Sequence, residues 1–155
     1  MKKYLLDTNI ISYLENPNKD EYWKVIDNLA SLWNDDIVHI SMLSIFEYQS
    51  SIELVKDDKL KKILTDKKNE LLKIFQIENL KLNQEIIFWE LQKWYLDKTW
   101  SNTKSAKKHT VDLMLASQCI SEDIILVSND NIFKIIAEFR DDFKHQNWID
   151  WFSNI

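Results

Sequence analysis

The chain has no glycine at any of its 155 positions. Glycine lets the backbone approach a phosphate or turn sharply, so its absence excludes the P-loop, the dinucleotide-binding GxGxxG turn and the GxSxG nucleophile elbow. Turns must instead be made by Asn, Asp and Ser, which tolerate unusual backbone angles. The stretches ENPNKD, WNDD and SNDN are the clearest candidates.

Length and hydrophobic content predict one globular domain that spans residues 1–155. Hydrophobic residues make up 45% of the chain, which is enough for a substantial core. No stretch has the pattern of a signal peptide or a membrane-spanning helix, so we expect a soluble, cytoplasmic protein. The single cysteine, Cys119, lies on an apolar helical pattern and is predicted to be a buried, reduced thiol.

The charge balance is acidic. A net charge of -5 argues against a protein that coats nucleic acid through a general positive field. Acidity does not exclude a nuclease, because carboxylates that hold a divalent metal also count as negative charges. Two lysine-rich runs, KLKKILTDKK and KSAKKH, can supply local contacts to nucleic acid, and each also fits a solvated helix face or loop.

Short apolar runs of strand length alternate with longer amphipathic stretches. Strands are predicted at residues 3–7, 36–41, 75–80 and 124–128. Helices are predicted at residues 8–15, 20–33, 42–54, 57–75, 83–100, 110–123 and 131–139, with a polar loop at 101–109. This alternation implies right-handed crossovers and a three-layer α/β/α sandwich with a central, mostly parallel sheet.

The predicted helix at 83–100 is apolar around more of its circumference than one core-facing stripe requires. Its large apolar residues are Ile86, Ile87, Phe88, Trp89, Leu91, Trp94, Tyr95 and Leu96. A second apolar face indicates either a protein partner or a helix buried on two sides within the fold. The sequence leaves both interpretations open.

Four acidic residues stand at comparable places in this architecture. Asp7 ends the first predicted strand, and Glu47 lies one turn into the helix after the second. Asp112 starts the helix before the last clear strand, and Asp130 follows that strand. Because the carboxyl ends of parallel strands meet at one edge of a sheet, the four acids can form one cluster.

Each acid also has a purely local explanation. Asp7 and Asp130 can cap the helices that follow them. Ser44 and Glu47 fit a capping box, and Asp112 suits the positive first turn of a helix. Capping and chemistry therefore remain alternatives for every one of these positions.

The surroundings of two acids indicate a nearby cation. Glu47 in SIFEYQ and Asp112 in TVDLMLA are each flanked by apolar residues, where an unpaired carboxylate is costly to desolvate. Mg²⁺ and Mn²⁺ are hard cations that prefer oxygen ligands, so they suit a carboxylate cluster.

The histidines do not indicate zinc. His39, His109 and His145 have no ligand spacing with one another or with Cys119. His109 lies three residues before Asp112 and can reach a substrate phosphate, but an ordinary surface histidine is the preferred interpretation.

Three segments, LLDTNIIS, ISMLSIFEY and VDLMLASQCISEDIILVSND, follow one another along nearly the whole chain. In this order they resemble the PIN-domain ribonucleases and, within them, the VapC-like toxins of type II toxin-antitoxin pairs. The resemblance implies a PIN-like fold and a Mg²⁺- or Mn²⁺-dependent endoribonuclease. It also implies hydrolysis of RNA phosphodiester bonds that leaves a 5′-phosphate and a 3′-hydroxyl.

The resemblance assigns catalytic and metal-binding roles to four residues, Asp7, Glu47, Asp112 and Asp130. Asn9 and Ser128 match supporting polar positions that orient the acids, metal-bound water or phosphate. Two residues depart from the family pattern. Ile132 stands where a further acid is common, which concerns how tightly the site holds metal. Gln49 stands near a position where glycine is common, which concerns loop geometry.

The implied partners are an RNA substrate, a cognate antitoxin that inserts a basic segment into the acidic groove, and a second copy of the chain in a homodimer. The alternative function is a catalytically weak or inactive PIN-like module that binds protein or RNA. In that case the acids serve as helix caps and the tryptophan-rich faces bind a partner.

Overall fold

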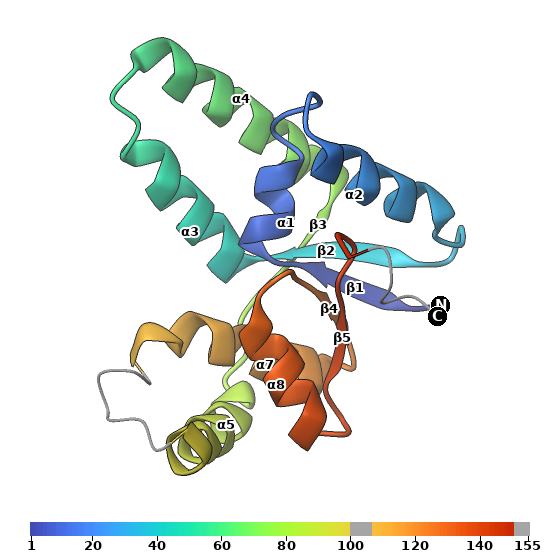
Figure 1. The fold of residues 1–155 in the computed structure, drawn as a ribbon, viewed down its shortest axis with the longest axis vertical. Coiled ribbons are helices and arrows are strands. Elements are labelled where there is room, and N and C mark those ends of the chain that lie inside the picture. The colour runs from blue at the N-terminus through green and yellow to red at the C-terminus, as the bar shows by residue number, and fades with distance from the viewer. Residues whose placement is uncertain (100–106, 151–155) are drawn as a thin grey trace.

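The computed structural model describes residues 1–99 and 107–150 and contains a five-stranded sheet in which neighbouring strands are parallel (Figure 1). The strands are β1 (Lys3–Leu6), β2 (Ile37–Ser41), β3 (Gln76–Glu78), β4 (Ile125–Val127) and β5 (Lys144–Gln146). Their order across the sheet is β3-β2-β1-β4-β5. The predicted α/β architecture is confirmed, with β5 added to the four expected strands.

Helices cover both faces of the sheet. They are α1 (Thr8–Tyr13), α2 (Asp20–Ser31), α3 (Met42–Glu53), α4 (Asp58–Ile74), α5 (Gln84–Thr99), α7 (Thr110–Glu122) and α8 (Asn131–Phe139). Figure 1 shows α1 to α4 on one side of the sheet and α5, α7 and α8 on the other, which gives the three predicted layers. Most of the predicted loop at 101–109 lies outside the described residues.

Alternation along β1 builds the two halves of the core, because successive strand residues point to opposite faces. Leu5 is fully buried against residues of α5, α7 and α8. Tyr4 and Leu6 are buried on the opposite face, with residues of α1, α2 and α3. Cys119 is buried in the first of these clusters as a free thiol, as predicted.

The absence of glycine has a visible consequence at the end of α7. Asp123, the residue that follows this helix, has φ 52° and ψ 51°. Glycine usually occupies this left-handed position, and aspartate tolerates it better than most residues do. The backbone N–H of Asp123 reaches the carbonyl groups of Cys119 and Ile120, which closes the helix end.

The helix α5 has apolar residues on two faces, one of which is buried and the other exposed. Leu91 and Tyr95 are buried in the core. Ile86 is 64% exposed and Trp89 is 60% exposed. The second apolar face is therefore not covered by any described part of the chain.

None of the described helices combines the length and the apolar character that a membrane span requires.

The strand register identifies the edge of the sheet at which a site can form. Leu6 at the end of β1 pairs with Ile40 of β2 on one side and with Val127 of β4 on the other. The residues that follow these three strand positions are therefore adjacent at the carboxyl edge, where open parallel sheets bind their ligands. They are Asp7, Ser41 and Ser128.

Candidate active site

Asp7 lies at this edge and is only 6% exposed. It is the N-cap of α1, since its Oδ1 accepts a hydrogen bond of 2.7 Å from the backbone N–H of Thr8. Its Oδ2 accepts two further bonds, from Ser128 Oγ at 2.7 Å and from Asn9 Nδ2 at 3.0 Å. The capping role is therefore real, and it leaves the second carboxylate oxygen for a polar cluster.

Ser128 and Asn9, the two predicted supporting residues, contact each other as well as Asp7. The Nδ2 of Asn9 also donates to Ser128 Oγ at 3.1 Å. Ser128 is fully buried, and its Oγ accepts a bond from the backbone N–H of Asp130 at 3.0 Å. One hydroxyl thus joins the end of β1 to the loop after β4.

Glu47 lies in the second turn of α3 and is exposed. Its Oε2 accepts a hydrogen bond of 2.7 Å from Thr8 Oγ1. The expectation that Glu47 is enclosed by its apolar neighbours is wrong, because residues adjacent in sequence point in different directions around a helix. Phe46, the residue before it, is itself 65% exposed.

The predicted capping box at Ser44 is also wrong. The helix α3 begins at Met42, as predicted, but its N-cap is Ser41, whose Oγ accepts a bond from the N–H of Leu43. Ser44 is buried inside the helix, and its Oγ lies 3.5 Å from the carbonyl oxygen of Leu6. Glu47 is consequently not used by the start of the helix.

Asp112 lies in the first turn of α7, with its side chain 23% exposed. Its Oδ2 is 2.8 Å from Nδ1 of His109. The fourth acid, Asp130, is exposed and caps α8, since its Oδ1 accepts a bond of 3.2 Å from the N–H of Ile132. The local explanation thus holds for Asp130 and for the helix position of Asp112.

Electrostatic coupling links Asp7 to two other acids. The pKa of the Asp7 carboxyl is raised to about 6, from an ordinary value of 3.8, chiefly by burial. The hydrogen bonds from Ser128 and Thr8 act in the opposite direction. The negative charges of Asp112 and Glu47 also contribute to raising this pKa, so both carboxylates lie close enough to act electrostatically on Asp7.

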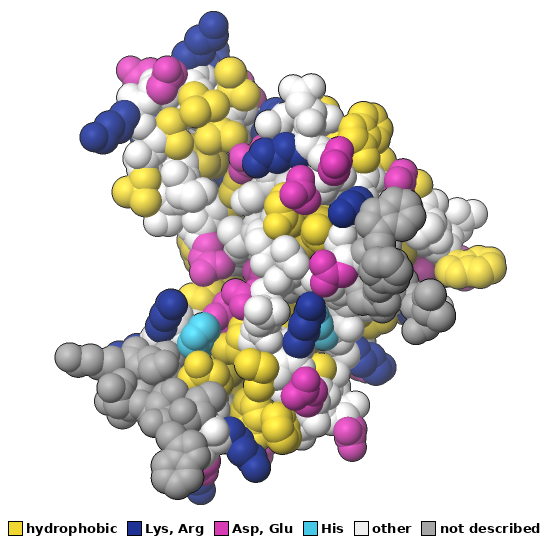
Figure 2. All heavy atoms as spheres, in the orientation of Figure 1, with side chains coloured by type: hydrophobic (Ala, Val, Ile, Leu, Met, Phe, Trp, Pro, Cys, Tyr) yellow, Lys and Arg dark blue, Asp and Glu magenta, His cyan; other side chains and the backbone are white. Residues whose placement is uncertain are grey.

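The same effects extend to the fourth acid. Burial raises the pKa of Asp112, and the charge of Asp130 raises it further. His109 and Lys108 lower it. Figure 2 shows acidic side chains gathered near the middle of one face of the molecule, with a histidine and a basic side chain beside them.

The side chains do not close into a ligand set as they stand. Within residues 1–99 and 107–150, no three His, Cys, Asp or Glu side chains are positioned to hold a metal ion. Thr8 holds Glu47, His109 holds Asp112, and Asp130 points to the start of α8. The structure therefore brings the acids within electrostatic range, and each keeps a local hydrogen-bond partner.

Two residues at this site were not singled out as parts of it from the sequence. Thr8 is the first residue of the predicted helix at 8–15, and in the structure it also bonds to Glu47 from a distant segment. His109 was expected to be an ordinary surface residue, yet its side chain is only 22% exposed and contacts Asp112. The spacing of three residues between His109 and Asp112 at a helix start was the available signal.

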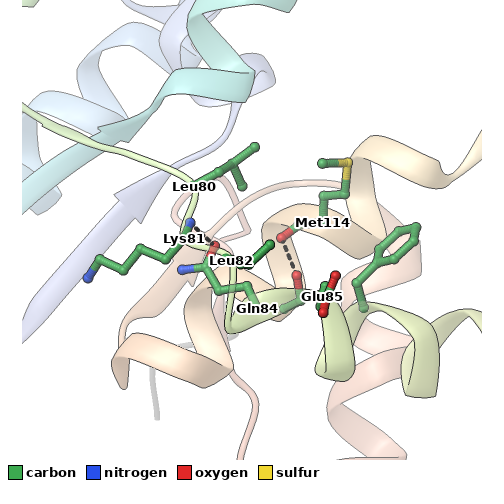
Figure 3. Close-up of a pocket in the computed structure, with 8 residues that line it drawn as sticks. Leu80, Lys81, Leu82, Gln84, Glu85 and Met114 are labelled. Carbon is green, nitrogen blue, oxygen red and sulfur yellow. Dashed lines mark hydrogen bonds between the residues drawn. The ribbon is translucent and has the colours of Figure 1, made fainter.

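An apolar pocket of about 320 Å³ lies away from these acids (Figure 3). It is formed by the segment between β3 and α5, by α5 itself and by α7, with Leu80, Leu82, Phe88 and Met114 in its wall. None of the four candidate acids lines it. The pocket is therefore separate from the candidate active site.

Known protein structures share this fold. VapBC2 from Rickettsia felis, bound to a DNA fragment from its promoter, has a TM-score of 0.70 at 24% identity, covering 94% of this chain and 98% of that chain. VapBC-1 from nontypeable Haemophilus influenzae has a TM-score of 0.73 at 17% identity, covering 96% and 99%. Mycobacterium tuberculosis VapC20, a Sarcin-Ricin loop cleaving toxin, has a TM-score of 0.60 at 15% identity, covering 86% and 94%.

Sequence comparison gives a family as well as a fold. No curated protein sequence matches the chain. The family model for the PIN domain matches residues 4–139, a range that runs from the second residue of β1 to the end of α8 and includes all four candidate acids. This chain therefore belongs to the PIN domain family, and its fold is VapC-like.

Proposed function

We propose that this chain is a divalent-metal-dependent endoribonuclease and the toxin of a toxin-antitoxin pair. The observation that carries the proposal is the buried carboxylate of Asp7 at the carboxyl edge of the sheet. Ser128 and Asn9 orient it, and it is coupled to the charges of Glu47 and Asp112. Membership of the PIN domain family and the fold shared with VapC20, a toxin that cleaves the Sarcin-Ricin loop, support the same function.

The donor set fits a hard divalent cation. We infer that Asp7, Glu47, Asp112 and Asp130 hold Mg²⁺ or Mn²⁺, because the group supplies carboxylate oxygens and no thiolate. A raised pKa is the expected state of a buried carboxylate whose charge no cation compensates. A bound ion of this kind lowers the pKa of a water ligand and neutralises charge on the phosphate during hydrolysis.

The chain's own residues prepare the site for that chemistry. Ser128 and Asn9 fix the orientation of the Asp7 carboxylate by donating to its Oδ2. The bond from Ser128 also favours the ionised form of Asp7, which is the form that binds metal. Because Glu47 is exposed, it can exchange its bond with Thr8 for a cation at little cost. The products of RNA hydrolysis would carry a 5′-phosphate and a 3′-hydroxyl.

The proposed partners are an RNA substrate, an antitoxin and a second copy of the chain. The solved structures that share the fold include VapBC-1 and VapBC2, the latter bound to promoter DNA. An antitoxin segment with Arg or Lys would be attracted by the acids around Asp7. The exposed Ile86 and Trp89 of α5 offer an apolar surface for a homodimer.

A second candidate function is a PIN-like binding module without cleavage. It is favoured by one observation: Asp7 and Asp130 act as helix caps, and no described group of side chains is ready to hold metal. The two candidates differ in their response to Mg²⁺, because only the nuclease requires it.

The test is cleavage of total RNA by the purified protein, free of any copurified inhibitor, with Mg²⁺ or Mn²⁺ and with a chelator. Discrete fragments that appear only with metal support the nuclease, and their ends identify the RNA that is cut. A folded protein that produces no fragment with either metal contradicts the nuclease and favours the binding module.

Replacing Ser128 by alanine will lower the cleavage rate by about 10- to 100-fold, which is typical of residues that orient a metal ligand. The Oδ2 of Asp7 loses the shorter of its two side-chain bonds, and Asn9 loses an acceptor. Initial rates over a range of Mg²⁺ concentrations will report the loss as weaker metal activation. Ser31→Ala on α2 is the matched control, since Ser31 is exposed and its Oγ donates to the carbonyl of Asn28 in its own helix. Equal rates for Ser128→Ala and the wild type would show that Ser128 does not orient Asp7 for catalysis.

A further inference from the structure

His109 is held beside Asp112 by two contacts. Its Nδ1 lies 2.8 Å from Oδ2 of Asp112. Its ring packs against the ring of Tyr95, with 5.3 Å between the centroids, and Tyr95 itself is buried. The imidazole is therefore fixed on the side of Asp112 and of Tyr95, and 22% of the side chain remains exposed.

The bond to Asp112 decides what the other ring nitrogen can do. An ionised carboxylate only accepts hydrogen bonds, so Nδ1 must carry the hydrogen and donate. In the neutral ring, Nε2 is then an acceptor with one lone pair. The structure shows no bond between Nε2 and any residue in 1–99 or 107–150. A hydrogen-bond acceptor thus stands next to a candidate metal-binding carboxylate without a partner in the described part of the chain.

The chemistry of this nitrogen selects among the groups of a nucleic acid. Phosphate oxygens at neutral pH accept hydrogen bonds, so they do not complement a lone pair. The ribose 2′-hydroxyl can donate, and it is attached to the carbon next to C3′, whose oxygen leaves when the phosphodiester is hydrolysed to a 3′-hydroxyl. DNA has no hydroxyl on this carbon, so a hydrogen-bond acceptor here distinguishes RNA from DNA.

We propose that Nε2 of His109 accepts a hydrogen bond from a ribose 2′-hydroxyl beside the scissile phosphate and so selects RNA over DNA. This inference rests on the function proposed above, because it requires that the acids around Asp7 cleave a phosphodiester bond. In it, His109 contributes twice: Nδ1 orients Asp112 and Nε2 recognises the sugar.

The experiment combines two proteins with two kinds of substrate at one fixed pH. The proteins are the wild type and His109→Asn, whose amide nitrogen can still donate to Asp112 but which has no atom at the place of Nε2. One substrate is a synthetic RNA of the mapped cleavage site. Two others are the same RNA with a single 2′-deoxy nucleotide, placed before the cut in one and after the cut in the other. We measure kcat/KM for all combinations.

One of the two deoxy substrates lacks the 2′-hydroxyl that His109 recognises. The wild type should cut the all-ribose RNA about fivefold faster than this substrate, which is the effect of one neutral hydrogen bond. His109→Asn should cut both at the slower rate and bind Mg²⁺ as the wild type does. Discrimination that persists in His109→Asn, or equal slowing of both substrates by the substitution, overturns the inference and leaves the nuclease intact. A deoxy substrate that neither protein cuts overturns the hydrolytic function itself, because the 2′-hydroxyl would then be the nucleophile.

Discussion

Replacing Asp7 by asparagine will lower the rate of RNA cleavage by more than about a hundredfold, beyond the loss typical of a residue that only supports a metal ligand. Asparagine keeps the size of the side chain and an oxygen that can accept from the N–H of Thr8. It removes the negative charge at the most buried of the four acids. In the proposed site, a cation would then lose the ligand that Ser128 and Asn9 hold in place.

The measurement is the initial rate of cleavage of a defined RNA at saturating Mg²⁺, with the fold checked by circular dichroism. The matched control is Asp27→Asn, which makes the same chemical change at an exposed position of α2. This control should cleave RNA at the wild-type rate. If Asp7→Asn is folded and cleaves RNA as fast as the control, Asp7 is only a helix cap and the proposed nuclease site is wrong.

The place of the acids in the fold could be predicted because it depends on simple patterns. Asp7 follows an apolar run of strand length, and parallel strands bring their carboxyl ends to one edge. The side-chain partners of Asp7, Asn9 and Ser128, were predicted from the family resemblance and not from local patterns. The contact between Asp7 and Ser128 joins residues 121 positions apart, and only the pairing of β1 with β4 makes them neighbours.

The surroundings of the helical acids could not be read from their sequence neighbours. Glu47 is flanked by apolar residues in sequence and is exposed in the structure, because the face of α3 that packs on the sheet carries Tyr48 and Ile52. Residue type favoured Ser44 as a cap, whereas the cap of α3 is Ser41, the last residue of β2. Such choices are made by packing between distant segments, which a local pattern does not contain.

Stability in the absence of metal will depend on pH through Asp7. The pKa of its carboxyl is about 6 in the folded chain, above its ordinary value of 3.8, because burial disfavours the charged form. Between these values the unfolded chain has released a proton that the folded chain retains, so unfolding becomes more favourable as pH rises. The stabilisation that the proton on Asp7 gives to the folded chain is therefore complete below about pH 4 and lost above about pH 6. This is a change of about 3 kcal/mol in the free energy of unfolding.

Urea unfolding in the presence of a chelator, at several pH values between about 4 and 7, will measure this change. The comparison that isolates it is the wild type against Asp7→Asn, because all other titrating groups are common to both proteins. The difference between their unfolding free energies should shift in favour of the variant as pH rises. A difference that stays constant over this range would mean that the Asp7 carboxyl is not destabilised by burial.

Mg²⁺ will restore the stability that ionised Asp7 removes. A ligand that binds only the folded state at a hundred times its Kd adds about 2.7 kcal/mol, so the thermal midpoint of the wild type should rise at about pH 7. The rise should be much smaller at about pH 4, where Asp7 is protonated and a proton competes with the metal. It should also be much smaller in Asp7→Asn at both pH values, whereas Asp27→Asn should respond as the wild type does. An equal rise in Asp7→Asn and the wild type would place the cation elsewhere on the chain, and the absence of any rise would favour the binding module over the nuclease.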